Sequence, residues 1–217
     1  MSVADLSDAK RELLRRRLRA RLAHDPIPRR PEGVEPPLSP AQEPLWFMER
    51  FTPGTTTYTL VIAVRLREPL DEDRLLRALA ALPVRHEGLR HRFPETEEGR
   101  PAVHVVDTTE VPLNRTTAVT DEEAIALIGA ETAVPLDLAR GPLLKCVVVS
   151  KGEDEHIVAL LVHHIVADGQ SLNLLMRDLL ALSRGEEPPA PAVRFGDVAL
   201  WQRERSPDRE LDYWRGS

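Results

Sequence analysis

Two adjacent histidines at the end of an apolar run are the residues of this chain best suited to chemistry. Residues 157–162, IVALLV, are all apolar, and His163 and His164 follow them directly. Asp168 and Gly169 come four and five residues after His164. Because an imidazole titrates near neutral pH, a histidine oriented by a neighbour can act as a general acid or base. Asp168 is a candidate for that neighbour, directly or through a shared network.

The segments around these histidines predict a strand, a polar loop and a helix. The apolar run suits a strand buried on both faces and is too short for an independent helix. Residues 170–182 place leucine and methionine at helical spacing. Because side chains alternate along a strand, we expect His163 and His164 to point in opposite directions. Paired histidines can also be hydrogen-bonded core residues, but the complete His-His-x-x-x-Asp-Gly pattern between strand and helix favours a site.

A second strand is predicted just before the apolar run. Gly141 and Pro142 turn the chain into residues 143–149, LLKCVVV, which can pair with residues 157–162 across the charged turn at 151–154. This hairpin would carry the histidines at its far end. Cys146 lies within the first strand, where we expect a small buried residue rather than a nucleophile. As the single cysteine, it excludes an internal disulfide and a cysteine-based metal cluster.

Composition indicates a globular protein with one sizeable core. The chain has 217 residues, of which 42% are hydrophobic and 29% charged. No apolar run approaches membrane-spanning length, and the amino terminus lacks a secretory apolar core, so we expect a cytoplasmic protein with no membrane partner. The net charge of -6 argues against nucleic-acid binding. Arginine supplies 26 of the 29 basic residues, which suggests genomic composition rather than phosphate recognition.

Three regions follow one another along the chain. Residues 1–23 include a predicted helix at 7–23 with leucines on one side and arginines on the other. This helix would either lie solvated on the domain or dock a partner. Residues 24–37 are rich in proline and predict a semi-stiff tether. The folded domain is expected from about Leu38 to residue 217.

Three further segments match motifs of a known family in the expected order. They are residues 38–51, LSPAQEPLWFMERF, residues 85–93, RHEGLRHRF, and residues 193–202, VRFGDVALWQ. Together with HHIVADG at 163–169, they resemble the condensation domains of nonribosomal peptide synthetases, which are relatives of chloramphenicol acetyltransferase. Pro44 replaces a customary arginine and should interrupt the helix expected after a Ser39 cap. The stretches VPLDLARGPLLKCVVV at 134–149 and LDYWR at 211–215 also resemble the family.

The resemblance implies an α/β fold of layered type. It corresponds to a chloramphenicol-acetyltransferase-like lobe, in which a mixed, mostly antiparallel sheet is covered by helices. Further strands are expected at residues 58–66, 102–106 and 111–117, and further helices at 71–82 and 121–133. In the family these segments form the amino-terminal lobe of two, and the tunnel runs between the lobes. A carboxyl-terminal lobe is therefore an expected partner.

The resemblance also implies an activity, which is amide-bond formation between two carrier-bound substrates. A donor carrier protein presents an acyl or peptidyl thioester and an acceptor carrier protein presents an aminoacyl amine, each on 4′-phosphopantetheine. His164 would position or deprotonate the attacking amine, or stabilise the tetrahedral intermediate. His163 and Asp168 would support the geometry, and Gly169 would let an arm pass close to the backbone. No tightly bound cofactor and no metal are implied.

An arginine commonly pairs with the aspartate of this motif in the family. Arg85 and Arg90 both fit, and Arg90 is favoured because it enters a predicted strand.

Other functions remain open. The chain could be a non-catalytic half-domain that docks carrier proteins or a partner. It could also be an epimerisation domain or a coenzyme A-dependent acyltransferase. The motifs at 39–47 and 85–93 weigh against the acyltransferase. The heterocyclising branch differs because it carries aspartate at the first histidine position.

Overall fold

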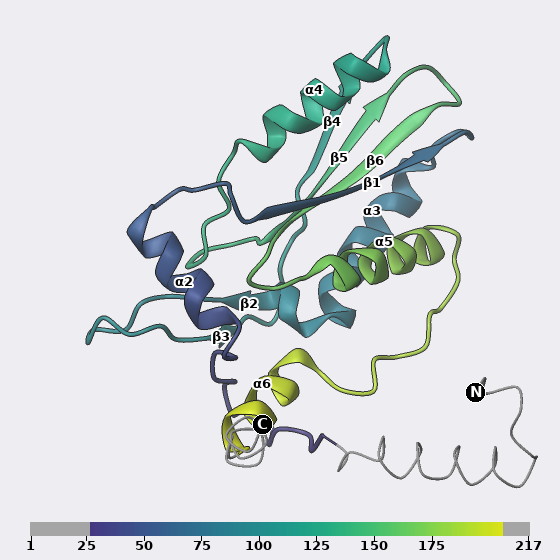
Figure 1. Cartoon of the computed structure of the whole chain (residues 1–217). Helices are drawn as coiled ribbons and strands as arrows, with labels where there is room; N and C mark the ends of the chain where they lie inside the picture. Colours follow the sequence, from purple (N-terminus) through teal and green to yellow (C-terminus); the bar gives the residue numbers. More distant parts are fainter. Residues whose placement is uncertain (1–26, 206–217) are drawn as a thin grey trace, which may run out of the picture.

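The computed structural model describes residues 27–205 of the chain. The helix predicted at residues 7–23 and the segment at 211–215 lie outside this range. Figure 1 shows a sheet with helices on both of its faces. This arrangement confirms the predicted layered α/β fold.

The main sheet has four strands in the order β1-β6-β5-β4. These strands are β1 (Thr59–Leu66), β4 (Leu113–Thr117), β5 (Leu144–Ser150) and β6 (His156–His163). Strand β6 pairs antiparallel with β1 and with β5, and β4 pairs parallel with β5. The predicted hairpin across the turn at 151–154 is therefore confirmed, and the sheet is mixed and mostly antiparallel.

Helices cover both faces of this sheet. Helices α3 (Glu72–Arg85) and α5 (Gly169–Ser183) pack together on one face, and α4 (Asp121–Thr132) covers the other, at the top of Figure 1. Alternate residues of β6 divide between two hydrophobic clusters, with Val158 and Leu160 in the larger one and Ile157 and Leu161 in the one beneath α4. Every residue of β6 is buried, as its unbroken apolar sequence predicts.

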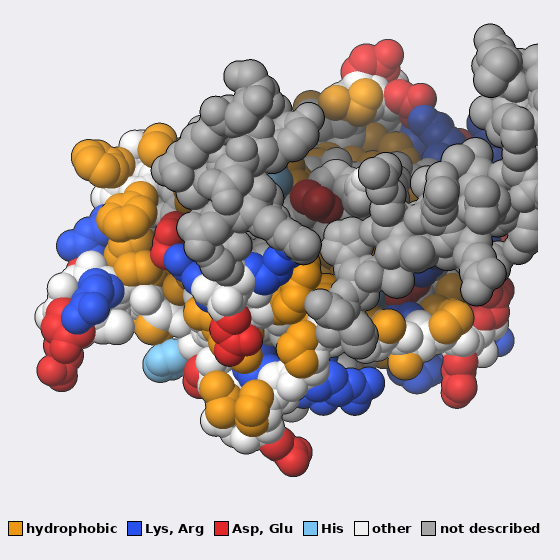
Figure 2. Space-filling view, turned by 60° about the horizontal axis from the view of Figure 1, so that its bottom comes forward, with side chains coloured by type: hydrophobic (Ala, Val, Ile, Leu, Met, Phe, Trp, Pro, Cys, Tyr) orange, Lys and Arg blue, Asp and Glu red, His pale blue; other side chains and the backbone are white. Residues whose placement is uncertain are grey.

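The remaining elements lie at the end of the sheet near the histidines. They are α2 (Gln42–Phe51), the 3₁₀ helix η2 (Glu87–Arg90), the two-stranded sheet of β2 (His91–Arg92) and β3 (His104–Val105), and α6 (Phe195–Glu204). Helix α2 leaves three large apolar side chains exposed, namely Phe47, Met48 and Phe51. In Figure 2, hydrophobic side chains gather on the left of the face shown, the side on which α2 lies in Figure 1.

Three local predictions need correction. Pro44 does not interrupt α2, because the helix begins only at Gln42 and the proline therefore falls in the first turn, where its missing N–H is not needed. Ser39 is not the cap, although its hydroxyl accepts a hydrogen bond from the Gln42 backbone at 3.3 Å. Arg90 lies in η2 rather than in a strand.

The proline-rich segment is without helix or strand from residue 27 to 41, but it is not a free tether. The Arg30 guanidinium, 8% exposed, pairs with Glu87 at 3.1 Å, and the Arg30 backbone N–H donates to Asp197 Oδ1 at 3.1 Å. Glu35 accepts a hydrogen bond from the Val105 backbone at 3.1 Å. The packed body therefore starts before the predicted Leu38.

Gly196, at the start of α6, provides a test of this packing. A Cβ atom there would lie 1.8 Å from Arg30 Nη1 and 2.9 Å from Pro36 Cβ. Because Arg30 cannot move away without leaving Glu87, we expect Gly196→Ala to lower the free energy of unfolding by about 1–3 kcal/mol in urea denaturation. Gly129→Ala, in α4 and facing open space, should instead be neutral or stabilising by up to about 1 kcal/mol. Equal effects of the two variants would contradict this packing.

Candidate active site

His163 and His164 face opposite ways at the end of β6. The His163 side chain is 1% exposed, whereas His164 is exposed. The His164 backbone N–H donates to the Tyr58 carbonyl at 2.8 Å, which holds the start of the loop beside β1. The structure thus bears out the expected alternation and leaves His164 as the accessible imidazole.

One hydrogen bond orients the His164 ring. Its Nδ1 atom lies 2.9 Å from the Ala167 carbonyl oxygen. Because a carbonyl oxygen can only accept, Nδ1 must carry the proton, and in the neutral ring Nε2 keeps its lone pair. Within residues 27–205 no hydrogen bond to Nε2 is present, so this nitrogen is free to accept a proton.

Asp168 caps helix α5 instead of orienting His164. Its Oδ1 atom accepts from the Ser171 backbone N–H at 2.8 Å and from the Ser171 hydroxyl at 2.7 Å. These hydrogen bonds lower the pKa of Asp168. The carboxylate is exposed, so it does not need the buried cationic partner that the sequence suggested.

The predicted pairing of Asp168 with Arg90 or Arg85 is wrong in this structure. The Arg90 guanidinium donates to the carbonyls of Pro83 and Val106. Arg85 pairs with Asp178 on α5, at 2.6 Å between Nε and Oδ2. Both arginines therefore have partners other than Asp168.

Asp178 is the carboxylate that this arginine motif holds. Its side chain is 0% exposed and also contacts His86 Nε2 at 3.0 Å and Arg177 Nη2 at 2.9 Å. Burial raises the pKa of Asp178, but the hydrogen bonds from Arg85 and Arg177 outweigh burial and leave it lowered. Burial lowers the pKa of His86. This cluster fastens the end of α3 to α5.

The buried side chain of His163 contacts the backbone of the loop that follows β6. Its Nδ1 accepts from the Ile165 backbone N–H at 3.1 Å, and its buried Nε2 has no hydrogen-bond partner among the described residues. Burial lowers the pKa of His163 to about 4, and the adjacent His164 contributes to the same direction. The ring is therefore neutral at pH 7, which suits a supporting role rather than proton transfer.

This depressed pKa predicts a pH-dependent stability. The unfolded state takes up the proton near pH 6.5 and the folded state only near pH 4, so stability falls as the pH falls through this window. We expect a loss on the order of 3 kcal/mol from His163 between pH 7 and pH 4. In His163→Asn, where an amide oxygen can still accept from Ile165, urea denaturation should show a shallower dependence. Parallel pH profiles of the two proteins would contradict the assignment.

Gly169 leaves the backbone open at the start of α5. A Cβ atom added there would meet no described atom within 4 Å. Space for an approaching molecule is thus present next to the loop. The passage of a substrate arm over Gly169 stays a prediction.

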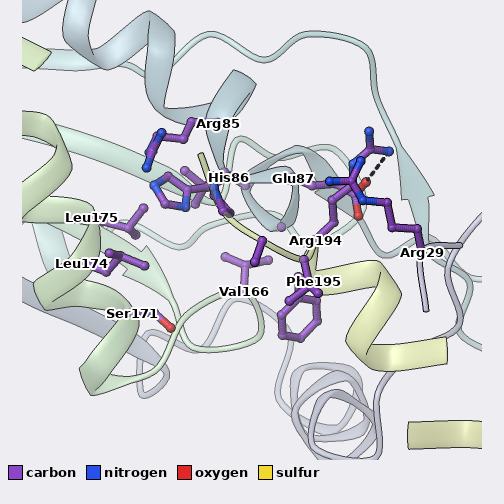
Figure 3. Close-up of a pocket in the computed structure, with 15 residues that line it drawn as sticks. Arg29, Arg85, His86, Glu87, Val166, Ser171, Leu174, Leu175, Arg194 and Phe195 are labelled. Atoms are coloured by element: carbon purple, nitrogen blue, oxygen red, sulfur yellow. Dashed lines mark ion pairs between the residues drawn. The ribbon is translucent and has the colours of Figure 1, made fainter. Parts of the chain in front are cut away.

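A cavity of about 290 Å³ lies beside the loop of residues 164–168, which carries His164 (Figure 3). Val166 and Ser171 line it from the loop and α5, and Arg85 to Leu89 line it from the end of α3 and from η2. Arg29 and the segment from Pro191 to Phe195 close the other side. Neither Arg29 nor Arg194 could be predicted to line this cavity, because both come from loops next to prolines, without periodicity.

Cys146 is buried in β5, and burial raises the pKa of its thiol to about 12, which fits the expected packing role.

In residues 27–205, His, Cys, Asp and Glu form no group of three or more that could hold a metal ion. In the same range, the helices are too short or too polar to cross a membrane.

Comparisons with known proteins all point to the same family. Residues 34–217 match the family described as Condensation domain. The chain is 38% identical over 234 residues to phosphinothricin tripeptide synthetase PhsC of Streptomyces viridochromogenes, covering 98% of this chain and 21% of the relative. It is 40% identical over 182 residues to a dimodular nonribosomal peptide synthase of Bacillus subtilis, covering 81% of this chain and 8% of the relative.

Solved structures agree with these relatives. The first condensation domain of the calcium-dependent antibiotic synthetase, in complex with a substrate analogue, matches with a TM-score of 0.71 and 29% identity over 85% of this chain and 47% of that chain. The X-domain from teicoplanin biosynthesis matches with a TM-score of 0.72 and 30% identity over 86% of this chain and 43% of that chain. This chain thus spans about half of these solved structures and a smaller share of the curated relatives. It belongs to the condensation domain family.

Proposed function

We propose that this chain is the amino-terminal half of a peptide-synthetase condensation domain. In complete form, that domain joins a carrier-bound acyl or peptidyl thioester to the amine of a carrier-bound aminoacyl group. The observation that carries the proposal is His164, whose ring is fixed by the Ala167 carbonyl and whose Nε2 is free at the exposed end of a buried strand.

The free Nε2 can serve the proton transfer that amide formation requires. The amine nitrogen attacks the thioester carbonyl, the new C–N bond forms, and the C–S bond of the thioester breaks. The nitrogen must lose a proton, which His164 Nε2 can accept and pass to the departing thiolate. The Ala167 carbonyl facing Nδ1–H would stabilise the imidazolium that forms transiently.

The other participants follow from the same proposal. Both substrates would arrive on 4′-phosphopantetheine arms of a donor and an acceptor carrier protein, and no tightly bound cofactor is required. A carboxyl-terminal lobe would close the open side of the loop near Gly169 and complete the tunnel. The carriers and the synthetase would work together in the cytoplasm.

The test is an amide-forming assay with two loaded carrier proteins. The chain is supplied alone or together with the carboxyl-terminal half of a homologous condensation domain. We expect product only with the second half present. Turnover by the chain alone would overturn the half-domain proposal, and carrier binding without turnover by the completed domain would favour a docking function. Acyl transfer from free coenzyme A thioesters would favour the acyltransferase alternative.

A further inference from the structure

The cavity beside the loop of residues 164–168, which is the proposed catalytic loop, has a cationic side. Figure 3 shows Arg29 and Arg194 extending toward Glu87 at one end of the cavity, with an ion pair drawn between Arg194 and Glu87. That contact is long, at 3.8 Å, and the Arg194 side chain is 61% exposed. Arg29 is exposed and makes no ion pair or side-chain hydrogen bond with any residue from 27 to 205. Two guanidinium groups are thus available to a ligand.

Glu87 does not neutralise this end of the cavity. Its carboxylate is 4% exposed and already binds the Arg30 guanidinium at 3.1 Å and the Gly196 backbone N–H at 3.2 Å. Burial raises the pKa of Glu87, but hydrogen bonds from His91 and Arg30 outweigh burial and lower it to about 2. The buried carboxylate of Asp197 lies here as well and accepts hydrogen bonds from the backbone N–H groups of Arg30 and Arg194. Two carboxylates therefore lie among Arg29, Arg30 and Arg194, and one positive charge remains in excess.

The positions of these two arginines are fixed by the packing around them. Arg30 points inward and is held by Glu87 and by the contact of its backbone with Asp197, so the adjacent Arg29 is held at the rim. Arg194 precedes α6, and its backbone N–H donates to Asp197 at 3.0 Å. Binding an anion here would require little ordering of the backbone, which favours affinity.

Four apolar side chains also line the cavity. Val166, Leu174, Leu175 and Phe195 line the cavity; Figure 3 shows Leu174 and Leu175 on α5, away from Arg29 and Arg194, and Phe195 next to Arg194 at the start of α6. Leu174 and Phe195 are partly exposed although they are large and hydrophobic. The volume of about 290 Å³ is near the lower end of the roughly 300–1,000 Å³ of small-molecule sites. The cavity therefore combines an anion-binding end with a short apolar wall.

We infer that this cavity binds a small phosphate ester with an aliphatic body. The phosphate would lie on Arg29 and Arg194, and the body would lie against Val166, Leu174 and Phe195. The excess positive charge favours an anion, and guanidinium groups bind phosphate oxygens with paired hydrogen bonds. The inference goes beyond the proposed function, because it does not involve His164. Since Val166 is two residues from His164, a bound ligand would contact the catalytic loop.

Titration of the 217-residue chain with n-hexyl phosphate tests the inference. Binding is followed by calorimetry at low salt and pH 7.5, with n-hexanol, inorganic phosphate and hexanoate as comparison ligands. We expect saturable binding of hexyl phosphate, binding of the other three weaker by about tenfold or more, and loss of affinity at high salt. No saturation at millimolar concentrations, or equal binding of hexanol, would overturn the inference.

Variants locate the binding. Arg29→Gln combined with Arg194→Gln should weaken hexyl phosphate binding by about tenfold or more. Arg67→Gln, at an exposed arginine with no ion pair in the described range, is the matched control and should change it by less than about twofold. Leu174→Ala should weaken hexyl phosphate but not inorganic phosphate. Unchanged binding by the double variant would overturn the inference. His164→Ala should bind normally, so a failure of the proposed catalysis leaves this test intact.

Discussion

Replacement of His164 by alanine is expected to lower the rate of amide formation by about 10²–10⁴-fold in the completed domain. The variant loses the one accessible imidazole at the end of β6 and with it the Nε2 lone pair that would accept the amine proton. Since His164 is exposed and its side chain makes a single hydrogen bond, to Ala167, the fold should change little. The assay is single-turnover product formation with loaded donor and acceptor carriers, at saturating concentrations of both.

A matched control separates chemistry from general damage. His104, an exposed histidine on β3, can be replaced by alanine in the same way, and its variant should retain the rate of the unaltered domain. Thermal unfolding of both variants should stay within a few degrees of the unaltered protein. If the His164→Ala domain forms the amide at a rate within about threefold of that of the unaltered domain, the proposed proton transfer is contradicted.

The largest expected effect on stability belongs to Asp178. In Asp178→Ala, the guanidinium of Arg85 and the ring of His86 lose the carboxylate that they share in the interior. Removal of one member of a buried ionic cluster typically costs about 3–5 kcal/mol, because the remaining charge stays buried without compensation. We therefore expect a loss of that size in the free energy of unfolding, measured by urea denaturation of the chain at pH 7.

An exposed carboxylate provides the comparison for this loss. Asp71 caps α3 by accepting from the Arg74 backbone N–H at 3.0 Å, and Asp71→Ala should cost only about 1 kcal/mol. If the two alanine variants lose similar stability, Asp178 is not the fastening point between α3 and α5. A loss from Asp178→Ala of several times that of Asp71→Ala would support it.

The sequence predicted the elements that depend on local patterns. The apolar run of β6, the turn into it and the helical spacing of α5 all lie within 40 residues, so periodicity was sufficient. Alternation along a strand also predicted that His163 and His164 would point in opposite directions, and the family resemblance assigned the chemistry to His164. The errors about the charge pairs around the candidate site concern residues that are distant in the chain.

Long-range charge pairing explains the main error. Among 26 arginines, nothing in the sequence distinguishes the partner of one carboxylate from that of another. Asp178 lies within α5 between Arg177 and Leu179, and its 0% exposure depends on how α3 packs against it. The carboxylate of Asp168, by contrast, accepts a hydrogen bond from nearby Ser171 as the N-cap of α5, a role that its position directly before Gly169 permits. The inward packing of Arg30 was missed for the same reason, since Glu87 and Asp197 are far from it in sequence.

The pairing of β1 with β6 has a consequence for biosynthesis. Leu66 lies opposite His156, about 90 residues later in the chain. At a translation speed of about 5–20 residues per second, β1 leaves the ribosome roughly 5–20 s before its partner. During that interval its hydrophobic side chains have no sheet to join, whereas β5 and β6 can close their hairpin almost at once. We therefore expect the newly made amino-terminal segment to be the part of this protein that most needs chaperone protection.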